Sequence, residues 1–232
     1  MAEQLTFTLP MREALGRGDF YVGPSNAVAV ASVDNWRDWP EGKFLLIGPA
    51  GAGKTHLAHV WAAESGAAVV GADTLAGADI PALAARPAVV VEDAPLIAGS
   101  ADGEAALFHL HNLLLAEGGR LLLTARSAPP RWGLELADLV SRMQATPSAA
   151  LEPPDDALLA AVLVKLFADR QLAVSPQVVA FLVTRMERSL DQARSLVAAI
   201  DTLALEQARP VTRALAGEVL ADMLDSGGDG AA

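Results

Sequence analysis

Cysteine is absent from the 232-residue chain, and basic residues never gather into a run. Without cysteine the chain can form neither a disulfide nor a cysteine-based zinc site, and nothing indicates secretion. Lys and Arg total 17 against 28 Asp and Glu, which gives a formal net charge of −11. Because proteins that neutralise DNA phosphates are usually basic, at least in patches, strong autonomous DNA binding is not expected.

Long apolar runs are also absent. Residues 1–20 contain no apolar stretch long enough for a signal peptide, and no segment approaches the roughly 20 apolar residues of a membrane span. We therefore expect a cytoplasmic protein without a membrane partner. Apolar residues nevertheless make up 52% of the chain, enough for a sizeable core in one large domain or two small ones.

Short apolar runs alternate with helical stretches in the first 150 residues. This alternation is typical of an α/β fold, in which helices cover both faces of a parallel sheet. The runs expected to form strands are 43–47, 67–70, 88–91 and 121–123, and the expected helices include 26–39, 54–65 and 104–117.

The pattern changes after about residue 150, where Pro153-Pro154 interrupts the chain. Asp155-Asp156 then begins a helix with carboxylates at its positive end, and Ser175-Pro176 is a cap followed by proline at the first helical position. No segment in this half of the chain is expected to form a strand, so we expect a small all-α domain. The expected organisation is an arm at 1–18, an α/β domain at 19–150, the helical domain at 151–225 and a disordered tail at 226–232.

A glycine-rich loop follows the first expected strand. The segment Gly48-Pro49-Ala50-Gly51-Ala52-Gly53-Lys54-Thr55 matches the phosphate-loop pattern G-x-x-x-x-G-K-[ST]. Its glycines let backbone N–H groups turn inward around an anion, and the N-terminus of the next helix adds its dipole. We expect Lys54 to contact the β- and γ-phosphates of ADP or ATP, and the Thr55 hydroxyl to bind Mg²⁺.

Two acids, Glu92 and Asp93, end the apolar run 88–91. Phosphate-loop enzymes place an acid at this point to hold Mg²⁺, and many place a second acid to orient the attacking water. We expect Glu92 to serve the metal and both acids to serve catalysis. The alternative is that one of them merely caps the strand end on the surface.

With these motifs in place, the chain resembles the AAA+ family, and within it the DnaA branch that includes the short regulator Hda. Residues 20–26 are similar to the family segment that lies against the nucleotide base. Residues 122–124 resemble the sensor 1 strand, 136–143 the segment with the arginine finger, and 187–191 the sensor 2 helix. The implied fold is an AAA+ parallel sheet between helices, followed by a helical lid.

This resemblance assigns roles to single residues. Arg142 is the implied arginine finger, and Arg188 is the implied lid arginine on a helix of the second domain. An ordinary surface salt bridge for Arg142 and a solvated helix position for Arg188 remain the alternatives. The residues expected to contact the nucleotide are Val22, Gly48, Pro49, Ala50, Gly51, Ala52, Gly53, Lys54, Thr55, His56, Thr124 and Arg188.

Two features depart from DnaA, and the second of them, together with the acidic balance of the chain, points to the Hda-like members of this branch. The strand ends in Glu92-Asp93, whereas DnaA usually has two aspartates, so fast self-hydrolysis is not expected. The chain also ends at the helical domain, whereas DnaA continues into a DNA-reading helix-turn-helix domain. Hda-like proteins carry a short peptide that docks on the β sliding clamp, and the arm holds similar residues: Gln4, Leu5, Phe7 and Leu9.

The function implied by this resemblance is regulation of replication initiation. The chain would bind ADP or ATP, dock on the clamp, reach DNA only through the clamp, and stimulate hydrolysis of DnaA-bound ATP with Arg142. An assembly of identical copies is also compatible with the family. Two alternatives stay open: an adaptor or helicase loader without a hydrolysis role, and a self-sufficient phosphate-loop ATPase or small-molecule kinase.

Overall fold

The computed structural model describes residues 21–228. They form two compact units, one of residues 24–152 and one of residues 21–23 with 153–228. The expected clamp peptide with Gln4, Leu5, Phe7 and Leu9 lies outside the described residues. Each unit has its own hydrophobic core.

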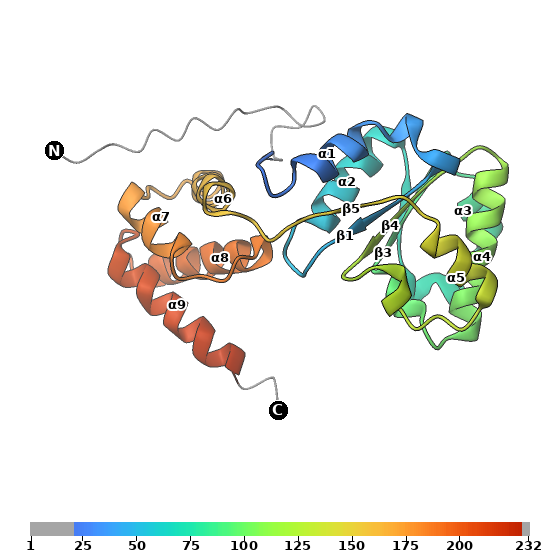
Figure 1. Ribbon diagram of the computed structural model, residues 1–232. Coiled ribbons are helices and arrows are strands. Elements are labelled where there is room, and N and C mark those ends of the chain that lie inside the picture. Colours follow the sequence, from blue (N-terminus) through green and yellow to red (C-terminus); the bar gives the residue numbers. More distant parts are fainter. Residues whose placement is uncertain (1–20, 229–232) are drawn as a thin grey trace. The chain divides into compact units, whose positions relative to one another are not determined.

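The first unit is built on a five-stranded sheet in which every pairing is parallel (Figure 1). The strand order is β2-β3-β4-β1-β5, so β1 lies between β4 and β5. This architecture confirms the predicted α/β fold. The strands are β1 (Lys43–Ile47), β2 (Ala68–Gly71), β3 (Ala88–Glu92), β4 (Arg120–Ala125) and β5 (Ser148–Ala150).

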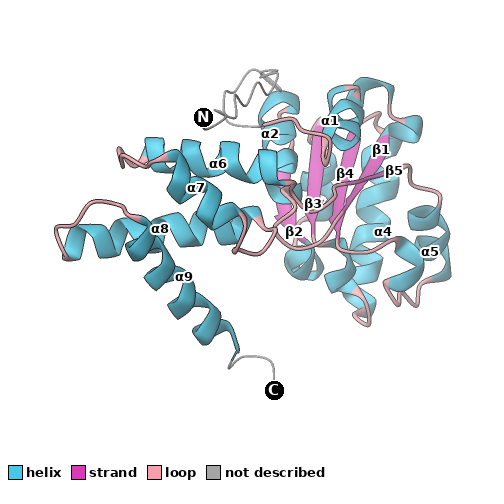
Figure 2. Ribbon diagram, turned by 60° about the vertical axis from the view of Figure 1, so that its left-hand side comes forward, coloured by secondary structure: helices cyan, strands magenta, loops and turns pink. Residues whose placement is uncertain are grey.

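Helices cover both faces of this sheet, with α1 and α2 on one face and α3, α4 and α5 on the other (Figures 1 and 2). Their bounds are α1 (Ala27–Asp34), α2 (Lys54–Ser65), α3 (Ile80–Ala84), α4 (Ala101–Ala116) and α5 (Ala137–Gln144). Short 3₁₀ turns connect the elements: η2 (Trp36–Asp38), η3 (Pro40–Gly42), η4 (Ala72–Gly77), η5 (Ala94–Ile97) and η6 (Pro129–Arg131).

The strands are apolar on both faces because helices bury both. Leu45, Val89 and Leu121 are fully buried within one core cluster. Beside α2, Trp39 stacks on Phe44 and on Trp61, with ring centroids 5.1 Å apart in each pair. These aromatic contacts hold β1 and α2, the two elements on either side of the phosphate loop.

The second unit consists of α6 (Asp156–Asp169), α7 (Pro176–Val183), α8 (Leu190–Glu206) and α9 (Arg213–Gly228), and residues 153–228 contain no strand. The Asp155 carboxylate accepts the Leu158 amide and caps α6. Leu163, Leu182 and Leu196 belong to the hydrophobic core of this second unit. None of the helices in the described chain is long and apolar enough to cross a membrane.

Three features differ from the sequence expectations. The helix expected over 26–39 ends at Asp34 and gives way to η2 and η3. The strand β5 was not foreseen, because a run of one serine and two alanines carries little strand preference. Helix α9 continues to Gly228, past residue 226 where the tail was expected to begin.

Candidate nucleotide site

The phosphate loop joins the end of β1 to the start of α2, as the motif predicts. Gly51 and Gly53 have φ angles of +69° and +98°, which residues with side chains rarely adopt, and they curl the backbone. Gly48 is needed for a different reason. A Cβ there would lie 2.5 Å from the Leu151 carbonyl oxygen, since the loop passes directly against the chain that leaves β5.

Lys54 begins α2 and lies back over the loop. Its Nζ donates to the Pro49 carbonyl oxygen at 2.8 Å, and only 7% of the residue is exposed. The ammonium is therefore held against the loop, with the N-terminus of α2 beside it. Backbone amides, a helix dipole and a lysine in this arrangement suit a polyphosphate.

The remaining motif residues differ in exposure. Pro49, Ala50 and Thr55 are exposed, whereas Gly51 and Ala52 are buried. Thr55 and His56 lie in the first turn of α2, and His56 is half-buried. Thr55 is thus accessible to a metal ion or phosphate at the start of the helix.

Glu92, Asp93 and Thr124 lie at the same edge of the sheet as the loop. Because all strands are parallel, the ends of β1, β3 and β4 lie at the same carboxyl edge. Glu92 ends β3, and its Oε2 lies 3.5 Å from Nε2 of His59, one turn beyond Thr55 on α2. Sequence patterns do not indicate this contact, because it joins residues of two separate elements.

Glu92 also carries a buried oxygen without a partner. Its Oε1 accepts no hydrogen bond from any residue in the described chain. Buried polar atoms are nearly always paired, so such an oxygen suits a bound ion or its water. Carboxylate and hydroxyl oxygens are ligands that Mg²⁺ accepts alongside phosphates, so Glu92 and Thr55 fit the predicted metal site.

Thr124 links β4 to Asp93. Its Oγ1 accepts the Asp93 backbone amide at 2.9 Å, and the residue is 1% exposed. Asp93 has φ +48° and ψ +49°, a left-handed conformation that aspartate tolerates better than most residues. The hydroxyl of Thr124 therefore holds the second acid at the edge where the phosphate loop begins.

Arg142 lies in the last turn of α5. Its guanidinium stands 5.1 Å from the centroid of the Phe108 ring on α4, a cation–π contact. Arg142 forms no ion pair with any described residue, so the ordinary salt bridge considered above is not what holds it. The side chain is half-buried.

A buried histidine indicates which edge of the sheet Arg142 lies near. Burial lowers the pKa of His111; the positive charges of Lys43 and Arg142 lower it further, against the hydrogen bond to Asn112. His111 Nε2 lies 3.4 Å from Lys43 Nζ. Lys43 is the first residue of β1, whereas the phosphate loop follows the last, roughly 13 Å further on at about 3.3 Å per residue. Arg142 thus belongs to the amino edge, opposite its own phosphate loop.

Val22 and Arg188 belong to the helical unit. The prediction that Arg188 lies on a helix is wrong: it occupies the bend before α8, whose N-cap is Ser189. The Arg188 guanidinium pairs with Asp156 at 2.7 Å and donates to the Pro154 carbonyl at 3.3 Å. Val22 is half-buried.

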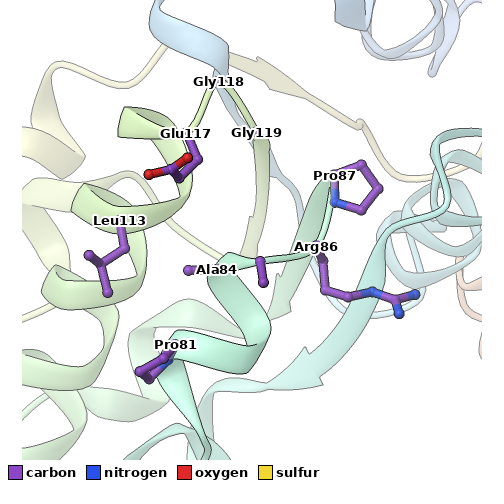
Figure 3. Close-up of a pocket in the computed structure, with 9 residues that line it drawn as sticks. Pro81, Ala84, Arg86, Pro87, Leu113, Glu117, Gly118 and Gly119 are labelled. Atoms are coloured by element: carbon purple, nitrogen blue, oxygen red, sulfur yellow. The ribbon is translucent and has the colours of Figure 1, made fainter.

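A groove of about 790 Å³ lies elsewhere on the first unit (Figure 3). Pro87 and Gly119, which directly precede β3 and β4, line it together with Leu113 and Glu117 of the α4 region. It therefore opens at the amino edge of the sheet and is separate from the phosphate loop. Among residues 21–228, no group of three or more histidine or acidic side chains is arranged to hold a metal ion by itself.

Known proteins resemble this chain in sequence. It is 29% identical over 232 residues to the chromosomal replication initiator protein DnaA of Caulobacter vibrioides and 30% identical over 235 residues to DnaA of Caulobacter sp. strain K31. The alignments cover 87% of this chain and 46% and 47% of those relatives. The chain is homologous to the AAA+ domain of DnaA. It spans about half the length of the DnaA proteins it matches, and no protein-family model matches it.

Solved structures support the AAA+ fold. Domain III of Thermotoga maritima DnaA aligns with a TM-score of 0.76 at 19% identity, covering 88% of this chain and 94% of that domain. A DnaA bound to AMPPCP and single-stranded DNA aligns with a TM-score of 0.67, also at 19% identity, over 82% of this chain and 66% of that one. The FIGL-1 AAA domain with ADP gives 0.60 at 14% identity, over 78% and 71%.

Proposed function

We propose that this DnaA-related chain binds ADP or ATP with Mg²⁺ and stimulates hydrolysis of ATP bound to DnaA while docked on the β sliding clamp. Such an activity would restrain replication initiation. The observation that carries the proposal is the setting of Arg142, a cation without an ion pair in the described chain, held at the sheet edge opposite its own phosphate loop.

Nucleotide binding follows from the loop. Backbone amides of residues 48–55 and the Lys54 ammonium would wrap the phosphates, as the AMPPCP complex of a structurally similar DnaA suggests. Thr55 and Glu92 would hold Mg²⁺, which when bound neutralises phosphate charge. The Thr124 hydroxyl, which already fixes Asp93, lies at the same edge and would sense a γ-phosphate.

The lid arginine would report on the bound nucleotide. Arg188 pairs with Asp156 through side chains that are 55% and 63% exposed. Exposed pairs of this kind contribute about 0–1 kcal/mol, so exchanging Asp156 for a phosphate would be inexpensive in free energy. Val22 would lie against the base, as the family segment implies.

Hydrolysis by the chain itself would be slow. Glu92 is one methylene longer than the aspartate usual in DnaA, which shifts its carboxylate relative to a bound metal. From the amino edge Arg142 would not reach the chain's own phosphates, so a self-sufficient ATPase would lack an arginine finger. The arrangement instead favours action on a neighbouring molecule, with DnaA as the partner.

In the neighbour, Arg142 would act electrostatically. A guanidinium placed beside the γ-phosphoryl group stabilises the charge that spreads over its oxygens in the transition state. The Phe108 ring holds this cation without neutralising it, because its contact involves a quadrupole rather than a carboxylate. A second identical copy could present its own phosphate loop to the same arginine, which would account for a homo-oligomer.

The clamp part of the proposal is tested with the arm. We expect the wild-type chain to bind immobilised clamp and to stimulate DnaA-bound ATP hydrolysis only when DNA-loaded clamp is present. Gln4→Ala/Leu5→Ala should lose both the binding and the clamp-dependent stimulation, since the peptide supplies the contact. Thr6→Ala/Thr8→Ala changes the same arm at alternate positions and serves as the control.

Each outcome has a distinct meaning. Retained clamp binding by Gln4→Ala/Leu5→Ala would refute the arm hypothesis. Clamp binding without any stimulation would favour an adaptor or loader, and ATP turnover without DnaA would favour a self-sufficient ATPase.

A further inference from the structure

Helix α4 presents a stripe of three residues toward α5. Glu104, Phe108 and His111 are spaced by four and three positions, so they lie on one face of α4. Phe108 stacks with Arg142, and His111 lies close enough for the charge of Arg142 to affect its pKa. The two helices run beside each other (Figure 1). Helix α5 therefore packs against this face of α4.

Glu104 makes the strongest of these contacts. The residue is 2% exposed, and its Oε2 accepts the Leu136 amide at 2.7 Å and the Glu135 amide at 2.9 Å. Its Oε1 accepts the Gly99 amide at 3.3 Å. A buried carboxylate that receives several amide hydrogen bonds is held firmly, and its removal leaves those donors unpaired.

Leu136 is the N-cap residue of α5. The Glu104 carboxylate consequently fixes the beginning of the helix whose last turn carries Arg142. A helix held at its first residue and by a ring contact in its last turn has little freedom to rotate or slide. We propose that Glu104 is a positioning residue for Arg142, and that it sets the direction in which the guanidinium is offered to a partner's phosphate.

The Gly99 amide, the third that the Glu104 carboxylate accepts, connects Glu104 to the chain's own nucleotide site. Gly99 follows η5, which directly continues from Asp93. The same carboxylate therefore joins the segment that follows Glu92 and Asp93 to the helix of Arg142. A change at Glu92 or Asp93 on nucleotide binding has a short covalent and hydrogen-bonded route to α5. This inference rests on the proposed role of Arg142 in trans.

Glu104→Gln tests the proposal in the full-length chain. The amide side chain keeps one acceptor oxygen and turns its NH2 group toward the backbone donors that the other oxygen served, so the hydrogen bonds to Gly99, Glu135 and Leu136 cannot all be kept and α5 should be held less firmly. We expect hydrogen exchange of those two amides to rise about tenfold or more. Stimulated hydrolysis of DnaA-bound ATP should fall on the order of 10- to 100-fold in kcat, with the KM for DnaA unchanged.

Matched variants separate positioning from stability. Asp102→Asn removes the same charge from an exposed position in the first turn of α4 and should change neither measurement. Glu104→Asp keeps the charge but withdraws it by one methylene, and should give an intermediate loss if Glu104→Gln does not fold. Adding Glu104→Gln to Arg142→Ala should cause no further loss of kcat, whereas a general weakening of the fold would add.

Two results would overturn the inference: exchange at Glu135 and Leu136 equal in Glu104→Gln and Asp102→Asn, or full stimulation by Glu104→Gln where Arg142→Ala has none. If Arg142→Ala itself stimulates normally, the proposed function fails. The exchange measurement then still decides whether Glu104 holds α5.

Discussion

Arg142→Ala is expected to lower the stimulated hydrolysis of DnaA-bound ATP by about 10³-fold or more, the range seen when an arginine finger is removed. Alanine eliminates the only cation that the structure places on Phe108, and nothing else in α5 can replace its charge. The chain should remain folded, because a cation–π contact at a half-buried site contributes only about 0.5–2 kcal/mol.

The measurement is release of labelled phosphate from DnaA preloaded with ATP, in the presence of clamp and DNA. Arg131→Ala is the matched control, since Arg131 is an exposed arginine in η6 just before α5. Clamp binding should survive both substitutions. Undiminished phosphate release with Arg142→Ala would mean that this residue is not the finger.

Gly48→Ala is expected to damage both the fold and nucleotide binding. The new Cβ would lie 2.5 Å from the Leu151 carbonyl oxygen and 3.3 Å from the Leu151 Cβ. Leu151 cannot easily retreat, because its amide donates to the Ile47 carbonyl at 2.7 Å and holds β5 beside β1. The free energy of unfolding should fall by about 1–3 kcal/mol, as for other overpacked sites.

The displaced loop should bind nucleotide at least about tenfold more weakly, because its amides no longer converge on the phosphates. Denaturant unfolding and a nucleotide titration measure the two effects. Gly77→Ala is the control, since a Cβ at Gly77 meets nothing within 4 Å and its φ is not positive. Equal behaviour of the two variants would show that the loop does not pass as closely against Leu151 as described.

Local sequence signals predicted the phosphate loop well. Its glycines, lysine and threonine act through positions that are adjacent in the chain, so the motif alone determines their arrangement. The same holds for the strand that ends in Glu92 and Asp93. By contrast, the contact between His59 and Glu92 and the grip of Glu104 on Leu136 join residues about 30 positions apart, and only the folded sheet brings them together.

Two differences between the predicted and the observed secondary structure have identifiable causes. Strand β5 consists of small residues without strand preference, and its pairing with β1 depends on the tertiary structure. The resemblance predicts a helical position for Arg188, whereas Ser189 followed three residues later by Gln192 is a signal that the helix starts after it. In the structure the Ser189 hydroxyl accepts the Gln192 amide at 3.2 Å, so that signal was available in the sequence.

The edge of the sheet at which Arg142 lies can be determined only from the order of the strands. The sequence alone could attribute an arginine finger to resemblance but could not tell which edge of the sheet it occupies. Placement at the amino edge follows from β5 pairing with β1 in parallel, since α5 directly precedes β5. This placement separates an arginine that serves its own nucleotide from one that serves a neighbour's.

Calorimetric titration of the purified chain with ADP, ATP and AMP, with and without Mg²⁺, tests the phosphate loop most directly. We expect one ADP or ATP per chain, binding strengthened by Mg²⁺, and far weaker binding of AMP, because the loop and Lys54 grip the phosphates beyond the first. Failure of both ADP and ATP to bind, or AMP binding as tightly as ADP, would contradict the account.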